Sequence, residues 1–316
     1  MSVPDEVPID VNNPSVRDYL NLVRLQVLTP LSVLVSIATV LVATTIVFPG
    51  LGAISKTHPT PISASPNVLG IYFLVLFACL IGYCCILVMA SEEDTKVTLT
   101  HGVGFSLVVA NWLLAGWAVA WALQWWISST ILLSLLTAVL LYSNVLLLIY
   151  HPPSRERPLD TLFIHAPMRL FLLLSATLLL PMSIFIMTGK TWDPIHADHR
   201  YSDYQWEGLA VILITNAVGW IIVILCRDIF WCIGAMWINI CILAEQPKSF
   251  PVEAAAIAFT VLQPLAFVGV GTWKLYKRNR EGAIRLPQDE EGAAVPPAAP
   301  NASNDAHERN IGRVWG

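Results

Sequence analysis

The chain has 316 residues and a net charge of −4, and its composition is far from that of a soluble globular domain. Hydrophobic residues make up 56% of the chain and charged residues 13%, against roughly 45–50% and about 25% in typical soluble domains. So few charges cannot cover a surface in contact with water, and the weak net charge favours no nucleic-acid partner. The bilayer is therefore the predicted solvent for most of the chain, and membrane lipids are its predicted partners.

Long apolar runs separated by turn residues predict an all-α, polytopic transmembrane helix bundle of about eight spans. A span needs about 20 mostly apolar residues, and a chain in lipid must satisfy its own backbone groups, which makes each run helical. The junction Arg227-Asp228 lies between the sixth and seventh runs. It is either a tight polar turn, which we favour, or the kink of a re-entrant pair of helices. The predicted spans are 28–48, 68–90, 101–123, 127–150, 164–187, 208–226, 229–245 and 252–276.

The segments outside the bundle differ from it in composition. Residues 1–27 are acidic and lack the basic start of a cleaved signal, so the first span is expected to act as an uncleaved anchor. The bundle is assigned to 28–276, and the Ala-, Pro- and acid-rich tail 277–316 is expected to be disordered.

The basic residues near the span ends predict which side each terminus faces, because cytoplasmic loops carry an excess of Lys and Arg. With eight spans both termini lie on one side, which would hold twelve basic residues against four on the other, so both termini are predicted to be cytosolic. The organelle is left open. The four on the opposite side are Lys56, Lys190, Arg200 and Lys248.

The segment "NWLLAGWAVAWALQWW", residues 111–126, holds five of the twelve tryptophans. Trp125 and Trp126 fit the headgroup belt at the end of a span. Trp117 and Trp121 lie deeper and form, with Trp125, a stripe at intervals of four. Two interpretations stay open: ordinary helix packing, or a cavity for a flat apolar ligand. A second stripe of small residues beginning at Asn111 predicts a close contact with another helix.

Polar side chains at depth normally point into a bundle. The neutral amides are expected to hold helices together by hydrogen bonds, and Arg169, near the start of the fifth span, is expected to snorkel toward the headgroups. These amides are Asn111, Asn144, Asn216, Asn239 and Gln263.

The longest polar loop, residues 189–208, carries His196 and His199 among carboxylates. Such a pair could bind a divalent metal, but no second His or Cys cluster completes a site, so a solvated loop is favoured and no metal or cofactor is predicted. No Ser–His–Asp order, phosphate cradle or H-E-x-x-H motif is present, so the chain is not predicted to be an enzyme.

Three segments resemble the tryptophan-rich sensory-type membrane proteins of the translocator protein family (TspO/MBR), and the acidic N-terminus and Pro-rich tail resemble a fungal membrane family of this type. The segments are "NWLLAGWAVAW", "IHAPMRLFLLLSATLLLP" and "RDIFWCIGAMWINICI", the last with a mid-span Trp237. The sequence differs from that family at Leu173-Leu174, where a Gly-Trp pair is usual. The resemblance implies a helical bundle that binds a porphyrin, sterol or other flat molecule.

The leading hypothesis is therefore a multi-pass membrane protein with an intramembrane site for a small apolar ligand. The alternative is a small-molecule transporter, which usually needs helices broken at the midplane, with Gly82, Gly219 and Pro264 as candidate breaks. The oligomeric state is left open. The predicted ligand-binding residues are Asn111, Trp117, Trp121, Asn144 and Trp237.

Overall fold

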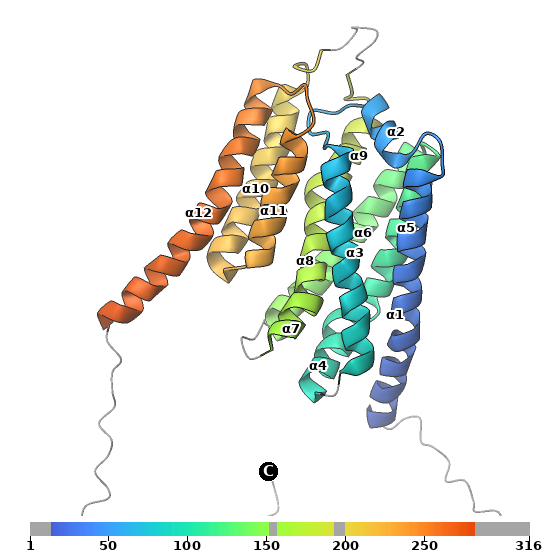
Figure 1. Cartoon of the computed structure of the whole chain (residues 1–316), viewed down its shortest axis with the longest axis vertical. Coiled ribbons are helices and arrows are strands. Elements are labelled where there is room, and N and C mark those ends of the chain that lie inside the picture. Colours follow the sequence, from blue (N-terminus) through green and yellow to red (C-terminus); the bar gives the residue numbers. More distant parts are fainter. Residues whose placement is uncertain (1–13, 91, 152–156, 193–199, 282–316) are drawn as a thin grey trace, which may run out of the picture. The chain divides into compact units, whose positions relative to one another are not determined.

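The computed structural model describes residues 14–90, 92–151, 157–192 and 200–281, and every regular element in these ranges is a helix (Figure 1). The chain divides into two compact units, Met1–Trp273 and Lys274–Gly316, and the fold described below is that of the first. The short elements are α2 (Leu51–Thr57), α4 (Glu93–Val97), α7 (Pro158–Asp160) and the π-helical stretches η1 (Thr98–Val103), η2 (Thr161–His165) and η3 (Leu174–Leu179). The longer helices are α1 (Pro14–Thr45), α3 (Pro66–Met89), α5 (Ser106–Ala122), α6 (Trp126–Tyr150), α8 (Ala166–Leu173), α9 (Leu180–Met187), α10 (Gln205–Cys226), α11 (Ile229–Leu243) and α12 (Phe250–Glu281).

The predicted all-α bundle is confirmed, with six or seven candidate membrane spans in the described residues against about eight predicted. Six helices are long and apolar enough to cross a membrane, and α4–η1–α5 adds a seventh if this bent pair counts as one span. The predicted seventh span, 229–245, corresponds to α11, an apolar helix of only 15 residues.

The predicted third span is bent, because α5 is tilted by 47° from the helix that precedes it. The bend is at Gly104, which has a φ of +51°. A Cβ there would lie 2.6 Å from the carbonyl oxygen of Thr100, so only glycine fits this tight, left-handed turn.

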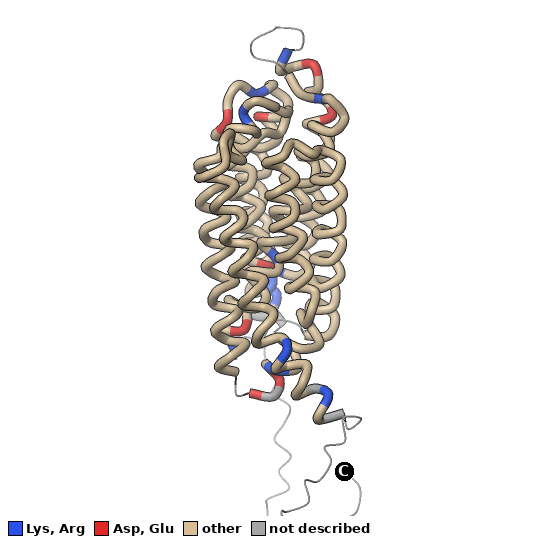
Figure 2. The backbone as a smooth tube through the Cα atoms, turned by 90° about the vertical axis from the view of Figure 1, so that its right-hand side faces the viewer, with Lys and Arg blue, Asp and Glu red and all other residues tan. Residues whose placement is uncertain are grey.

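The distribution of charge agrees with a bundle that spans a membrane. Figure 2 shows Lys, Arg, Asp and Glu mostly at the two ends of the bundle, with a largely uncharged tube between them. Large apolar side chains such as Leu74, Leu135 and Ile214 are more than half exposed on the outer faces of their helices. Such apolar surface is suited to contact with lipid tails.

The rod formed by α7, η2, α8, η3 and α9 lies at the centre of the bundle. All eight residues of α8 are buried, and this helix packs against α3, α6 and α11. On one side of the rod, α5 packs closely between α1 and α6, and on the other side α10 packs against α11.

Buried and half-buried amides join the helices as the sequence predicts. The Nδ2 of Asn144 on α6 donates to the carbonyl oxygen of Met168 on α8 at 3.0 Å. On α10 and α11, Asn216 and Asn239 form a reciprocal pair, in which each Nδ2 donates to the Oδ1 of the other at 3.2 and 2.9 Å. The pair fixes the register of α10 against α11.

We expect Asn239→Leu to lower the free energy of unfolding by about 1–2 kcal/mol, because it removes both hydrogen bonds and leaves the Oδ1 of Asn216 without its donor, while the Nδ2 keeps its bond to the carbonyl oxygen of Ile212. Thermal unfolding in detergent, followed by circular dichroism, measures the change. The double variant Asn216→Leu/Asn239→Leu should lose less than the sum of the two single variants. If the changes in the free energy of unfolding were strictly additive, the hydrogen bonds between the two amides would contribute nothing to stability.

Candidate functional site

An apolar groove of about 220 Å³ opens on the side of the bundle. Trp117 and Trp121 of α5 form its back wall and are only 3% and 2% exposed. Leu41 of α1 and Leu74 of α3 line its outer edge and are more than half exposed. Because both of these edges belong to lipid-facing helices, the groove is accessible from the hydrocarbon region of the bilayer.

The remaining walls come from helices that are distant in sequence. Leu51 and Gly52 of α2 line the groove, together with Leu179 of η3 and Met182 of α9. The walls are apolar apart from a few hydroxyl groups. One of these, Thr44 Oγ1, donates to the carbonyl oxygen of Val40 within its own helix, so it offers little to a bound molecule.

The small-residue face of α5 explains why the two indoles lie beside α1. Asn111 is fully buried, and its Oδ1 accepts a hydrogen bond from Ser36 Oγ of α1 at 3.3 Å. Ala115 and Ala118 on the same face are also buried, which allows the close approach of a neighbouring helix that the sequence predicts. Asn111 is therefore committed to helix packing and does not line the groove.

The predicted tryptophan stripe is wrong at its outer end. The ring centroids of Trp117 and Trp121 lie 5.8 Å apart, and the next ring in contact with Trp121 is Trp126, edge-on at 5.3 Å. Trp125 does not lie on the same helical face, because α5 ends at Ala122 and the chain turns sharply at Gln124, which has a φ of +58°. Trp125 is 60% exposed.

Trp117 has an unpaired donor. Its Nε1 is buried and has no hydrogen-bond partner among the described residues, whereas a buried indole N–H usually finds one. The wall of the groove thus combines a large aromatic surface with one unsatisfied polar atom.

The other predicted site residues lie outside the groove. Asn144 lines a smaller cavity of about 120 Å³ together with Arg169 and Asp228. Trp237 of α11 donates from Nε1 to the carbonyl oxygen of Val68 at 3.2 Å and lies edge-on to the ring of Tyr72. The structure therefore brings together only Trp117 and Trp121 of the five predicted residues.

A buried ion pair between Arg169 and Asp228 joins the central rod to the α10–α11 turn. Arg169 is 8% exposed, so the expectation that it snorkels is wrong. Asp228 also caps α11, since its Oδ1 accepts from the backbone N–H groups of Phe230 and Trp231 at 3.0 and 3.2 Å. A charged residue inside an apolar run was the available signal, but its partner is 59 positions away in the sequence.

The predicted metal candidates His196 and His199 lie outside the described residues. Among the residues that are described, no group of three or more His, Cys, Asp or Glu side chains could hold a metal ion. The six cysteines are free thiols.

Comparison with known proteins gives one family. Residues 26–270, well over half of the chain, match the model of the TSPO-like protein family. Comparison with curated proteins and with solved structures yields no match. The resemblance to TspO-type proteins drawn from the sequence is thereby confirmed, and the match covers the six or seven candidate spans almost completely. The chain is a multi-pass integral membrane protein and belongs to the TSPO-like protein family.

Proposed function

We propose that the protein is a non-catalytic membrane protein that binds a flat, apolar, lipid-soluble molecule, porphyrin- or sterol-like, in the groove at Trp117 and Trp121. The observation that carries this proposal is the groove itself: an apolar space of about 220 Å³, backed by two buried indole rings and bordered by lipid-facing residues. Flat ring systems gain contact area and favourable ring geometry against indoles.

The size of the groove limits how the ligand is held. Pockets that enclose drug-sized molecules have volumes of roughly 300–1,000 Å³, and this groove is smaller. The ligand would therefore bury one part against α5 and leave the rest in contact with lipid, which requires a molecule that is soluble in the bilayer.

The polarity of the walls favours a ligand with a single polar end. Ser55, at the α2 end, lines the apolar groove and also a neighbouring polar cavity that contains Lys56 and Lys248. A hydroxyl at one end of the ligand could bond to Ser55 there while the ring system lies against Trp117 and Trp121. This arrangement favours a sterol-like lipid over a porphyrin with several charged groups.

No specific observation favours the transporter alternative. The candidate breaks Gly82, Gly219 and Pro264 lie within α3, α10 and α12, and each of these helices is continuous through that position.

Filling the groove tests the proposal. A Cβ on Gly70, which lines the groove, would meet no atom within 4 Å, so Gly70→Leu adds a side chain without a clash. We expect it to raise the Kd for a fluorescent polyene sterol by about tenfold or more, since the added leucine occupies space that the ligand needs. Energy transfer from tryptophan to the sterol, with the protein in nanodiscs, measures binding, and a porphyrin is titrated in parallel.

Gly269→Leu is the matched control. Gly269 is also a helical glycine with open space at its Cβ, and it lies on α12, outside the groove. Binding that is not saturable for either probe, or equal binding by wild type and Gly70→Leu, would remove the groove as the site.

A further inference from the structure

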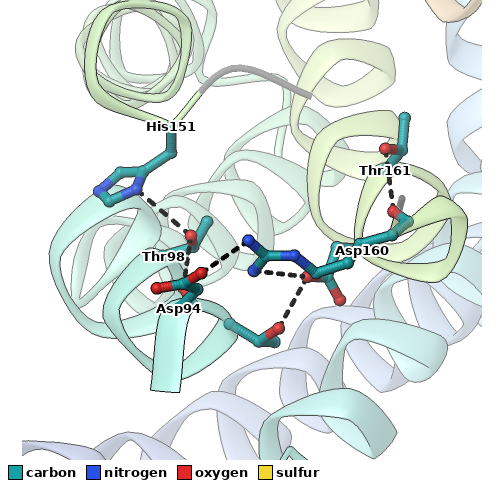
Figure 3. A network of polar contacts seen from close by, with 7 residues as sticks. Asp94, Thr98, His151, Asp160 and Thr161 are labelled. Carbon is teal, nitrogen blue, oxygen red and sulfur yellow. Dashed lines mark hydrogen bonds and ion pairs between the residues drawn. The ribbon is translucent and has the colours of Figure 1, made fainter. Parts of the chain in front are cut away.

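A polar cavity of about 290 Å³ lies where α4 and η1 meet the end of α6 and the start of the central rod. Figure 1 shows α4 and α7 at the end of the bundle opposite to α2 and the groove, and Figure 3 shows polar residues of the cavity from close by. The groove is lined by the last turns of α1 and α5, whereas this cavity is lined by residues that precede α5 and by residues from the last residue of α6 onward. Nothing in the proposed function uses it. Its polar lining residues are Asp94, Thr98, Tyr150, His151, Arg157, Asp160, Thr161 and His165.

Among the described residues that line the cavity, two carboxylates and one guanidinium give a charge of −1. Arg157 lies between two carboxylates: its Nη2 is 2.8 Å from Asp94 Oδ2, and its Nη1 is 3.8 Å from Asp160 Oδ2 (Figure 3). Thr95 Oγ1 donates to the same Asp160 oxygen at 2.7 Å. Each carboxylate can accept about four hydrogen bonds, so both keep free acceptor capacity, while the guanidinium of Arg157 is already engaged.

His151 adds a neutral acceptor. Burial and the nearby His101 lower the pKa of His151 below its usual value, so the ring is uncharged at pH 7. Its Nδ1 is 3.3 Å from Thr98 Oγ1, and that hydroxyl donates its one proton to the carbonyl oxygen of Asp94. We therefore assign His151 Nδ1 as the donor in its contact with Thr98, and this tautomer has Nε2 as an acceptor.

His165 is the buried group that lacks a partner. It is 4% exposed and lines the cavity, and its Nδ1 has no hydrogen-bond partner among the described residues. A buried polar atom without a partner is costly and rare. A bound molecule with N–H donors would provide one at this position.

We propose that this cavity binds a protonated amine, with its ammonium group held by Asp94, Asp160 and the imidazole nitrogens of His151 and His165. The net negative charge and the surplus of acceptors fit a cation that carries several N–H donors. The ring of Tyr150, which also lines the cavity, can add a cation–π contact. An anion is disfavoured because Arg157 is already neutralised by carboxylates. The proposal is independent of the groove and its ligand.

Calorimetric titration of the full-length protein in maltoside micelles with ethanolammonium chloride tests the proposal. We expect saturable binding that Asp94→Asn weakens by about tenfold or more, because a hydrogen bond to a charged group is lost. The side chain of Asp94 is 79% exposed, so this variant should fold. His165→Gln should weaken binding as well, whereas Asp203→Asn, an exposed carboxylate in the loop before α10, should leave it unchanged.

The sign of the effect of Arg157→Gln separates an amine site from an anion site. Removing the competing cation should tighten the binding of ethanolammonium, whereas a phosphate or sulfate site would be weakened. Weaker amine binding by Arg157→Gln, the absence of saturable binding, or an unchanged Kd in both Asp94→Asn and Asp160→Asn would overturn the proposal.

The ammonium group could belong to a soluble amine or to the head group of phosphatidylethanolamine. Adding this lipid to the micelles should block the titration if the head group is the natural occupant. If it does not compete while ethanolammonium still binds, a soluble amine is the occupant. Both results support an amine site and differ only in its source.

Discussion

Replacing Arg169 by leucine is expected to lower the free energy of unfolding by about 3–5 kcal/mol, because the substitution leaves the carboxylate of Asp228 buried without its counter-charge. Both side chains are almost inaccessible, at 10% and 2% exposure. Asp228 cannot turn away to find water, since its Oδ1 also holds the first N–H groups of α11. Loss of the pair should therefore loosen the start of α11 as well as its contact with α8.

Equilibrium unfolding in mixed micelles provides the measurement, and a double-variant cycle provides its internal check. Arg169→Leu/Asp228→Asn should recover a large part of the loss, because no unpaired charge remains and an asparagine can still cap α11. Lys190→Ala is the matched control, since its ion pair with Glu207 is 38% and 40% exposed and should contribute at most about 1 kcal/mol. Equal effects of Arg169→Leu and Lys190→Ala would show that the buried pair has no special role.

Trp121→Ala should lower the free energy of unfolding by about 2–3 kcal/mol. The indole is fully buried and contacts the rings of Trp117 and Trp126. Removal of such a side chain from a soluble core costs about 3–5 kcal/mol, as lost transfer energy plus a cavity. In a bilayer the transfer contribution is smaller, because lipid is as apolar as the protein interior, and lost packing accounts for most of the change.

Trp125→Ala is the companion variant, because Trp125 is 60% exposed and lies beyond the end of α5. Its unfolding midpoint should stay close to that of the wild type when both variants are heated in the same detergent. If the two tryptophan variants proved equally stable, the wall of the groove would not depend on the packing of Trp121.

The features that could be predicted from the sequence are mainly those that depend on residue spacing and polarity along a single helix. The spacing of four residues places Trp117 and Trp121 on one face of α5, and Ala115 and Ala118 on the face that contacts a neighbour. The buried amides also hold helices together as expected, because a polar group surrounded by hydrocarbon has few alternatives.

The features that escaped prediction depend on chain reversals and on distant partners. The left-handed residues Gly104 and Gln124 mark the bend before α5 and the turn after it, and the second turn brings Trp126 instead of Trp125 to Trp121. The pairing of Arg169 with Asp228 arises from the packing of α8 against α11 and the turn before it. The polar cavity likewise combines residues from five elements, so no local pattern could reveal it.

The shortness of α11 has a consequence for the surrounding lipid. At a rise of 1.5 Å per residue, its 15 residues span about 22 Å, whereas the hydrocarbon region is about 30 Å thick. One flank of α11 must therefore lie below the headgroups of an undeformed bilayer, either the turn with Arg227 and Asp228 or the loop with Lys248. Local thinning relieves this mismatch at fractions of a kcal/mol per Å. The protein should consequently be surrounded by a thinned annulus on this side and should partition toward thinner membranes.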